Sequence, residues 1–156
     1  HDGVFMEQSI SAPADLYKKD DPLYTCDSVS EVYKSACARS QVPVMRQRLG
    51  LNTFQIANAC NESRNDKIIY HCIDALGYFS TQMASGDPDL IIKGCREIVD
   101  EKSVGQCTAA AAGELVFQDM AGWQSKVVTV CNSLSAVYRS GCEDRVTQVK
   151  EAYGRN

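Results

Sequence analysis

The organisation of this chain is set by residues 60–72, CNESRNDKIIYHC, in which two cysteines stand 12 positions apart with a polar stretch between them. Three further couples have the same form, with separations of 11 or 12 positions. The eight cysteines are Cys26 with Cys37, Cys60 with Cys72, Cys95 with Cys107, and Cys131 with Cys142. The second members recur every 35 residues, and a period of that length is typical of αα-hairpin repeats.

The residues around the cysteines repeat together with them. Short apolar-periodic runs come before three of the first cysteines and predict first helices at 53–59, 89–94 and 124–130. Longer helical patterns carry the second cysteines and predict second helices at 29–41, 67–84, 105–120 and 135–152. Asp87-Pro88 and Gly122-Trp123 fall between repeats, where one helix is expected to end and another to begin.

The first repeat departs from this pattern. Residues 21–25 are too short for a full first helix, and Pro43 is expected to end or kink the second one. Terminal repeats of an array are often atypical, so the repeat interpretation stands. Residues 1–10 have the pattern of a second-helix tail, which would make the chain a fragment of a longer array. We therefore expect an N-terminal half-repeat and linker over 1–23, followed by a disulfide-stapled αα-repeat domain over 24–156.

The geometry of a helical hairpin favours one pairing of the cysteines among the many that eight allow. In an αα-hairpin the end of one helix is adjacent to the start of the next. A separation of 11 or 12 residues with a turn therefore places two Cα atoms within the roughly 4.4–6.8 Å that a disulfide spans. We expect each cysteine to pair within its couple, which gives one disulfide per hairpin. Disulfides indicate an extracytoplasmic protein, whether periplasmic, secreted or at the cell surface.

These features resemble the tetratricopeptide-like helical repeats, and especially the disulfide-stapled, cysteine-rich αα-repeat proteins that bacteria secrete. The resemblance covers about residues 24–152 and rests mainly on the cysteine period. Residues 75–79, ALGYF, look like the small-and-aromatic centre of such a repeat. The resemblance implies an all-α fold, a right-handed αα-hairpin solenoid with repeats of about 35 residues.

Length and composition narrow the class of protein further. A chain of 156 residues with 44% hydrophobic and 23% charged residues has the size and composition of one globular domain. The net charge of -4 comes without a basic stripe, so no nucleic-acid partner is expected. No run of about 18 apolar residues occurs, so no transmembrane segment is expected in this chain.

Metal and catalytic readings of the same residues are disfavoured. Structural zinc needs cysteines two to four positions apart, and here no two are closer than 11. An N-terminal histidine such as His1 can chelate copper, but only His71 remains to complete that site. His71 would need a nucleophile and an orienting carboxylate to act as the base of a hydrolase. Asp87 and Asp89 lack the spacing of a calcium loop, and the other acidic pairs suit helix caps. We expect no cofactor, no bound metal and no enzymatic activity.

Aromatic residues give the remaining functional hint. Most of them are expected to pack between neighbouring hairpins. Any that stay exposed would be anchors for a partner, because Tyr and Trp dominate interface hot spots. The candidates are Tyr33, Tyr78, Trp123 and Tyr138.

The resulting hypothesis is a non-catalytic, extracytoplasmic protein-protein interaction module, with a protein partner in a multisubunit or membrane-associated assembly. In that role the chain is an accessory subunit or ectodomain of a larger complex. The alternative is a helical carrier of a small ligand or a metal. Fold-level analogy does not choose between them, because repeat arrays serve many partners.

Overall fold

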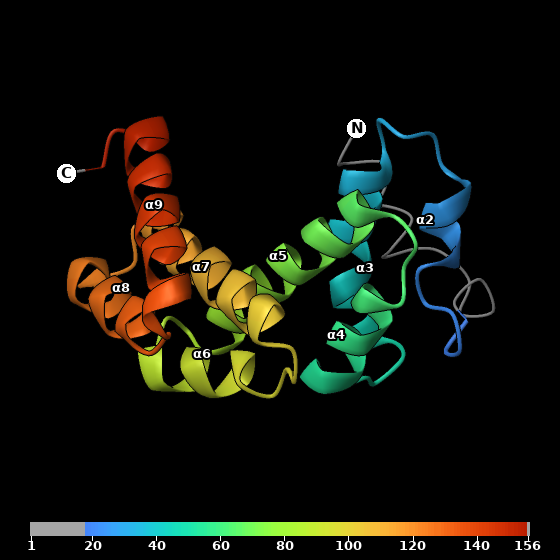
Figure 1. Ribbon diagram of the computed structural model, residues 1–156, viewed down its shortest axis with the longest axis horizontal. Helices are drawn as coiled ribbons and strands as arrows, with labels where there is room; N and C mark the ends of the chain where they lie inside the picture. The colour runs from blue at the N-terminus through green and yellow to red at the C-terminus, as the bar shows by residue number, and fades with distance from the viewer. Residues whose placement is uncertain (1–17, 156) are drawn as a thin grey trace. The chain divides into compact units, whose positions relative to one another are not determined.

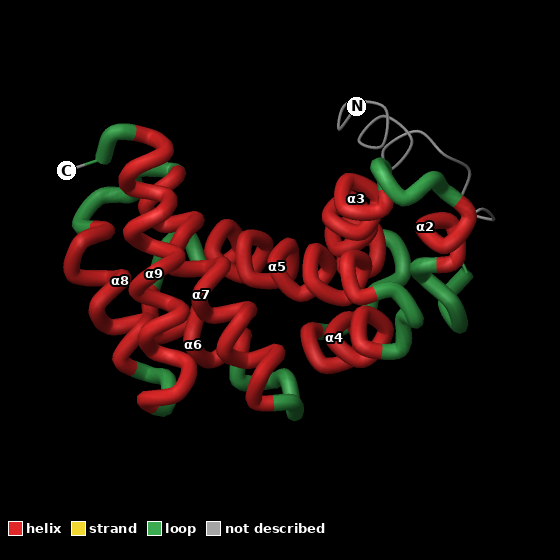
Figure 2. The backbone as a smooth tube through the Cα atoms, turned by 45° about the horizontal axis from the view of Figure 1, so that its top comes forward, coloured by secondary structure: helices red, strands yellow, loops and turns green. Residues whose placement is uncertain are grey.

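The computed structural model describes residues 18–155, and all regular structure in that range is helical (Figure 2). The helices are α2 (Tyr24–Ser28), α3 (Lys34–Gln47), α4 (Thr53–Asn61), α5 (Asp66–Met83), α6 (Pro88–Cys95), α7 (Glu101–Phe117), α8 (Trp123–Asn132) and α9 (Ala136–Tyr153). The all-α expectation is confirmed for these residues. Most of the expected half-repeat and linker, residues 1–17 of 1–23, lies outside the described residues.

The chain forms two compact units that divide inside helix α5. The first ends at Leu76 and contains α2, α3, α4 and the N-terminal part of α5. The second begins at Gly77 and contains the C-terminal part of α5 together with α6 to α9 (Figure 1). The division falls within the 24–156 domain that the sequence predicts.

All four disulfides join the two members of a couple, and these are the pairs that the sequence spacing predicts. The Cα–Cα distances lie between 5.5 and 5.8 Å, inside the usual range for a disulfide. Each disulfide joins a shorter helix to the N-terminal half of a longer one. The cysteines are at most 4% exposed, so each disulfide is part of the core as well as a cross-link.

Side-chain caps explain where several helices begin. The Asp87 carboxylate accepts hydrogen bonds from the backbone N–H groups of Asp89 and Leu90, and Pro88 occupies the first turn of α6. At α4, the Asn52 side chain accepts from the N–H of Gln55, while the Gln55 side chain accepts from the N–H of Asn52. This reciprocal capping box satisfies two N–H groups that a helix start would otherwise leave without partners.

Helix α7 begins earlier than its apolar pattern predicts. The sequence predicts 105–120, whereas the helix runs from Glu101 to Phe117. The Asp100 carboxylate accepts a 2.7 Å hydrogen bond from the backbone N–H of Ser103 and fixes the start. The end is set by Asp119, whose φ of 50° is left-handed and incompatible with a continuing helix.

Helix α3 corrects the expectation for Pro43. The sequence predicts a helix over 29–41 that Pro43 ends or kinks. The helix instead runs from Lys34 to Gln47 with Pro43 inside it, so the predicted end at Pro43 is wrong. An interior proline costs about 3 kcal/mol because it removes one backbone hydrogen bond. Val42, Val44 and Met45 are at most 3% exposed, and burying each contributes about 1.5–3 kcal/mol. Their combined burial outweighs the lost hydrogen bond, so the helix extends through the proline.

The second compact unit is built around helix α7, which carries small residues where neighbouring helices approach. Its segment 105–113 contains two glycines and a run of four alanines. A methyl group at Gly77 of α5 would collide with the carbonyl oxygen of Cys107 and the Cβ of Ala110, so α5 lies directly on α7. Helix α9 packs on the same helix (Figure 1), with the Tyr138 ring against Gly105. The core beneath contains Leu115, Val116 and Val130, all fully buried.

Candidate functional site

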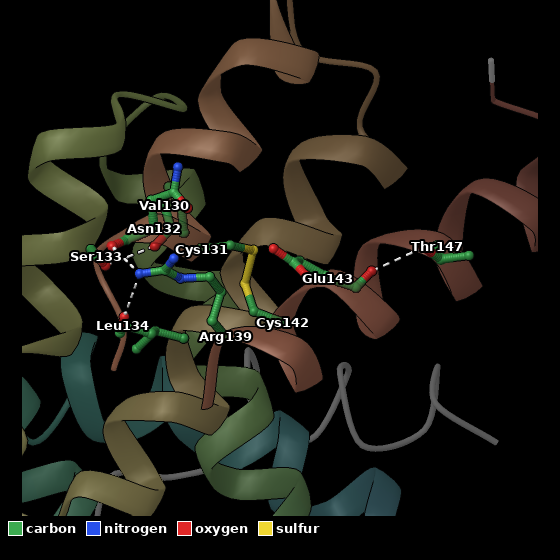
Figure 3. The surroundings of a disulfide bond; sticks show 9 residues. All are labelled: Val130, Cys131, Asn132, Ser133, Leu134, Arg139, Cys142, Glu143 and Thr147. Carbon is green, nitrogen blue, oxygen red and sulfur yellow. Dashed lines mark hydrogen bonds between the residues drawn. A yellow bond between two sulfur atoms is a disulfide. The ribbon is translucent and has the colours of Figure 1, made fainter. Parts of the chain in front are cut away.

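The loop closed by Cys131 and Cys142 is held by side chains that satisfy the carbonyl groups at the end of α8 (Figure 3). The Ser133 hydroxyl donates to the carbonyl oxygen of Val130 at 2.7 Å. The Arg139 guanidinium donates to the carbonyl oxygens of Asn132 and Leu134 at 3.4 and 3.3 Å. These bonds supply partners for carbonyls that a helix end leaves unsatisfied.

The first hairpin repeats this arrangement with an almost equivalent sequence. Residues 26–37, CDSVSEVYKSAC, and 131–142, CNSLSAVYRSGC, are identical at seven of twelve positions. The Ser28 hydroxyl donates to the carbonyl oxygen of Thr25, and the Lys34 ammonium lies 3.5 Å from the carbonyl oxygen of Asp27. The shared serine and basic residue therefore close the hairpin in both places, and their role is structural.

The sequence-predicted anchors are largely drawn into the protein. Trp123 is 5% exposed and belongs to the core of the second unit, with the Lys150 ammonium 5.8 Å from its ring centroid. Its ring lacks the exposure that an anchor needs. Tyr138 is half-buried against Gly105, and Tyr33 is half-buried in the first unit.

Tyr78 is also half-buried and takes part in a polar contact within the second unit. Its hydroxyl accepts a hydrogen bond from the Arg145 guanidinium of α9. The Arg145 side chain passes over Gly113, where the space of a missing side chain lets it cross α7. Tyr78 therefore ties α5 to α9, which is a packing role rather than an exposed anchor.

The residues considered for metal binding or catalysis have ordinary surroundings where the structure describes them. His71 is half-buried, and its ring makes an edge-on contact with Tyr70 at 5.1 Å between centroids. Within the described range, no three His, Cys, Asp or Glu side chains are placed to hold a metal ion. His1, the candidate for copper chelation, lies outside the described residues. Every cysteine is in a disulfide, which leaves no free thiol in the chain.

An acidic recess lies in the first compact unit, where α2 meets the end of α4. It has a volume of about 420 Å³ and is lined by Asp20, Asp21, Pro22, Leu23, Asp27, Ala59, Glu62, Ser63 and Arg64. Four of these residues are acidic and one is basic. A recess with that balance of charge suits a cationic group better than an anionic or an apolar one.

The second unit carries a surface feature that the sequence patterns did not single out. Met83, Phe117 and Tyr153 lie in the last turns of α5, α7 and α9, and are 65%, 41% and 56% exposed. We call these three residues the apolar row. They follow the second cysteine of their repeats by 11, 10 and 11 positions. The corresponding positions in the first repeat, Gln47 and Arg48, are polar.

The three helix ends that carry the apolar row have the same backbone form. Each closes with a hydrogen bond from an N–H group to the carbonyl oxygen five residues earlier. The bonds are Gly86 to Thr81 at 3.1 Å, Met120 to Leu115 at 3.2 Å and Arg155 to Lys150 at 3.0 Å. A residue with positive φ precedes each donor, namely Ser85, Asp119 or Gly154. This is the hydrogen bond of the Schellman helix end. Met83 and Phe117 lie three residues before its donor, and Tyr153 lies two residues before it.

Two members of the apolar row touch, and a charged pair flanks them. The Phe117 and Tyr153 rings meet edge-on with centroids 4.8 Å apart. The Arg155 guanidinium lies 2.8 Å from the Asp119 carboxylate and also donates to the carbonyl oxygen of Phe117. The Asp119 and Arg155 side chains remain 55% and 35% exposed, so an incoming surface can reach both charges.

The apolar row could have been found by comparing the last turns of the three long helices. Single exposed apolar residues are ordinary on protein surfaces, which is why helical periodicity alone does not flag them. Large apolar side chains in the last turns of three consecutive long helices are a stronger signal. The arrangement can bind another apolar surface through contact and desolvation.

The structure contains no helix in 18–155 with the length and hydropathy needed to cross a bilayer. Four disulfides within one chain indicate an oxidising compartment. Comparison of the chain with protein-family models, with curated protein sequences and with solved structures finds no match.

Proposed function

We propose that this chain is a non-catalytic, extracytoplasmic protein-protein interaction module. The observation that carries the proposal is the apolar row, because these side chains are exposed in the last turns of three helices and the fold does not bury them. When a partner covers exposed apolar side chains, the free energy falls by about 25 cal/mol for each Å² of apolar surface removed from water. In this role the chain is an accessory subunit or ectodomain of a larger assembly that is multisubunit or membrane-associated.

The architecture proposed for this role is a right-handed αα-hairpin solenoid of tetratricopeptide-like repeats, with one disulfide per hairpin. Two features support it: the 35-residue period of the cysteines and the contact of α7 with both α5 and α9 in the second unit. Repeat arrays of this kind present equivalent residues of successive helices along one surface. The resemblance to secreted bacterial cysteine-rich repeat proteins agrees with an oxidising compartment.

A binding experiment tests this function. Disulfide-intact protein is used to capture partners from the extracytoplasmic fraction of its source, beside the variant Phe117→Ser/Tyr153→Ser and the control Val128→Ser. Val128 is 58% exposed on α8, outside the apolar row. We expect the wild-type protein and the control to retain one partner at fixed stoichiometry and the double variant to lose it. Equal recovery by all three proteins would contradict a binding role for the row.

The alternative function, a carrier of a small ligand or metal, is favoured by the acidic recess of the first unit. Its carboxylates Asp20, Asp21, Asp27 and Glu62 would suit a cationic ligand. Native mass spectrometry of protein from its source tests this alternative. A bound mass that disappears in Asp27→Asn/Glu62→Gln would place the carrier function first.

A further inference from the structure

The apolar row has a charge pattern that selects among possible partners. Phe117 and Tyr153 are flanked by one acid and one base, Asp119 and Arg155, which lie 2.8 Å apart. A site for a strongly acidic partner would carry an excess of bases, and a site for a basic partner an excess of acids. Here the two charges cancel, and each remains partly exposed.

A balanced pair beside an apolar centre suits a two-fold symmetric contact. In such a contact the same patch is used by both molecules, and residue i of one copy meets residue j of the other in both directions. A patch with one acid and one base beside its centre can then place acid against base twice. A patch with charges of only one sign would place like charges together.

We propose that the apolar row binds a second copy of this chain through a two-fold symmetric contact. Phe117 and Tyr153 of both copies form the centre. The Asp119 carboxylate of each copy, which pairs with Arg155 of its own chain, then also contacts Arg155 of the other copy. This inference names the partner for the proposed function and rests on it.

The association is non-covalent, because all eight cysteines are used within the chain. It therefore leaves no cross-linked dimer on a non-reducing gel. The exposed ion pair inside each copy contributes little to stability, on the order of 0–1 kcal/mol, so rearranging it costs little. Charge reversal at either residue should consequently disturb association more than folding.

Sedimentation equilibrium over a range of protein concentrations tests the contact. We expect the wild-type protein to be in a reversible monomer–dimer equilibrium and Phe117→Ser/Tyr153→Ser to be monomeric. The control Val128→Ser should dimerise as the wild-type protein does. Circular dichroism establishes that each variant keeps its helices. Equal dimerisation of the double variant would overturn the inference.

Two single charge reversals make the test independent of the apolar substitutions. Asp119→Arg puts two bases in the patch, and Arg155→Glu puts two acids there. Each variant alone should dimerise at least about tenfold more weakly than the wild-type protein. Mixing the two variants should restore association as a heterodimer, because both cross-contacts then join opposite charges. Absence of restoration would overturn the paired 119–155 contact.

The outcomes separate this inference from the proposed function. A wild-type protein that stays monomeric at all concentrations, yet binds a different protein through the apolar row, overturns the second copy as partner and supports the function. A protein that neither dimerises nor binds any partner overturns both. If Asp119→Arg alone and Arg155→Glu alone each dimerise as well as the wild-type protein, the two-fold contact described here is overturned.

Discussion

The ring of Tyr138 on α9 lies against Gly105 of α7 so closely that a methyl group at Gly105 would stand 2.9 Å from the ring atoms Cγ and Cδ1. Real Cβ atoms do not sit that near a ring, so the absence of a side chain lets the two helices approach. The contact lies near the disulfide that joins Cys131 to Cys142, at the start of α9. It fixes α9 against α7 at the end opposite the apolar row.

Gly105→Ala should therefore destabilise the protein by about 1–3 kcal/mol, although alanine is the better helix former, because the ring must move. Gly141→Ala is the matched control, since a Cβ there would meet nothing within 4 Å and the residue lies inside α9. The control should be stabilised by about 0.5–1 kcal/mol. Urea denaturation of both variants checks the pair. Stabilisation by Gly105→Ala would show that α7 and α9 are not this close.

Asp100 should give the protein a defined dependence on acid. Hydrogen bonds from the Ser103 side chain and backbone lower the pKa of Asp100 below its ordinary value. A carboxyl whose pKa is lower in the folded state adds stability that is present above its unfolded pKa and is lost as pH falls through its folded pKa. Asp100→Ala should cost about 1 kcal/mol near neutral pH because α7 loses its cap.

Asp100→Asn separates the charge from the cap. Asparagine caps helices about as well as aspartate, so this variant should keep the cap but lose the pH-dependent part of the unfolding free energy. The difference in unfolding free energy between wild type and Asp100→Asn should shrink as the pH is lowered from about 7 to about 3. A difference that stays constant across this range would exclude the stated role of the carboxylate.

Trp123 should behave as a core residue. Because it is 5% exposed and the chain has one tryptophan, its fluorescence should be that of an apolar environment and resist an aqueous quencher. Trp123→Ala should lower stability by about 3–5 kcal/mol, as large-to-small changes in cores do. If the wild-type protein emits like a water-exposed tryptophan and Trp123→Ala leaves the unfolding midpoint unchanged, Trp123 is an exposed residue and a candidate anchor.

The disulfide between Cys131 and Cys142 should contribute to stability on the scale of a short closed loop. Replacing both cysteines by alanine should cost about 2–4 kcal/mol. The loss should appear as a lower urea midpoint, while the remaining three disulfides still form. A double variant as stable as wild type would mean that the caps from Ser133 and Arg139 suffice to close the hairpin.

Much of the fold is predictable from the sequence because the same signal occurs four times. The cysteine couples predict the four disulfides, and Asp87 marks a helix start through the hydrogen bonds that its carboxylate accepts. Pro43 shows where local rules fail, since the buried side chains beside it decide the outcome. Helix α7 likewise begins at Glu101 because a single capping residue precedes it, ahead of the apolar pattern.

The surface was harder to predict than the helices. Tyrosine and tryptophan were reasonable anchor candidates by residue type, but residue type does not say which face of a helix is covered. Trp123 lies in the core, whereas Phe117 and Met83 remain exposed at helix ends. The exposure of a helix end depends on how its neighbours pack, and that information is not local in the sequence.

The pairing of the cysteines is the claim on which the proposed hairpins and the oxidising compartment both depend. Proteolysis of the non-reduced protein followed by mass spectrometry of the linked peptides measures it directly. We predict four linkages, Cys26 to Cys37, Cys60 to Cys72, Cys95 to Cys107 and Cys131 to Cys142. A free thiol, or a linkage between cysteines of different couples, would contradict the disulfide-closed hairpin.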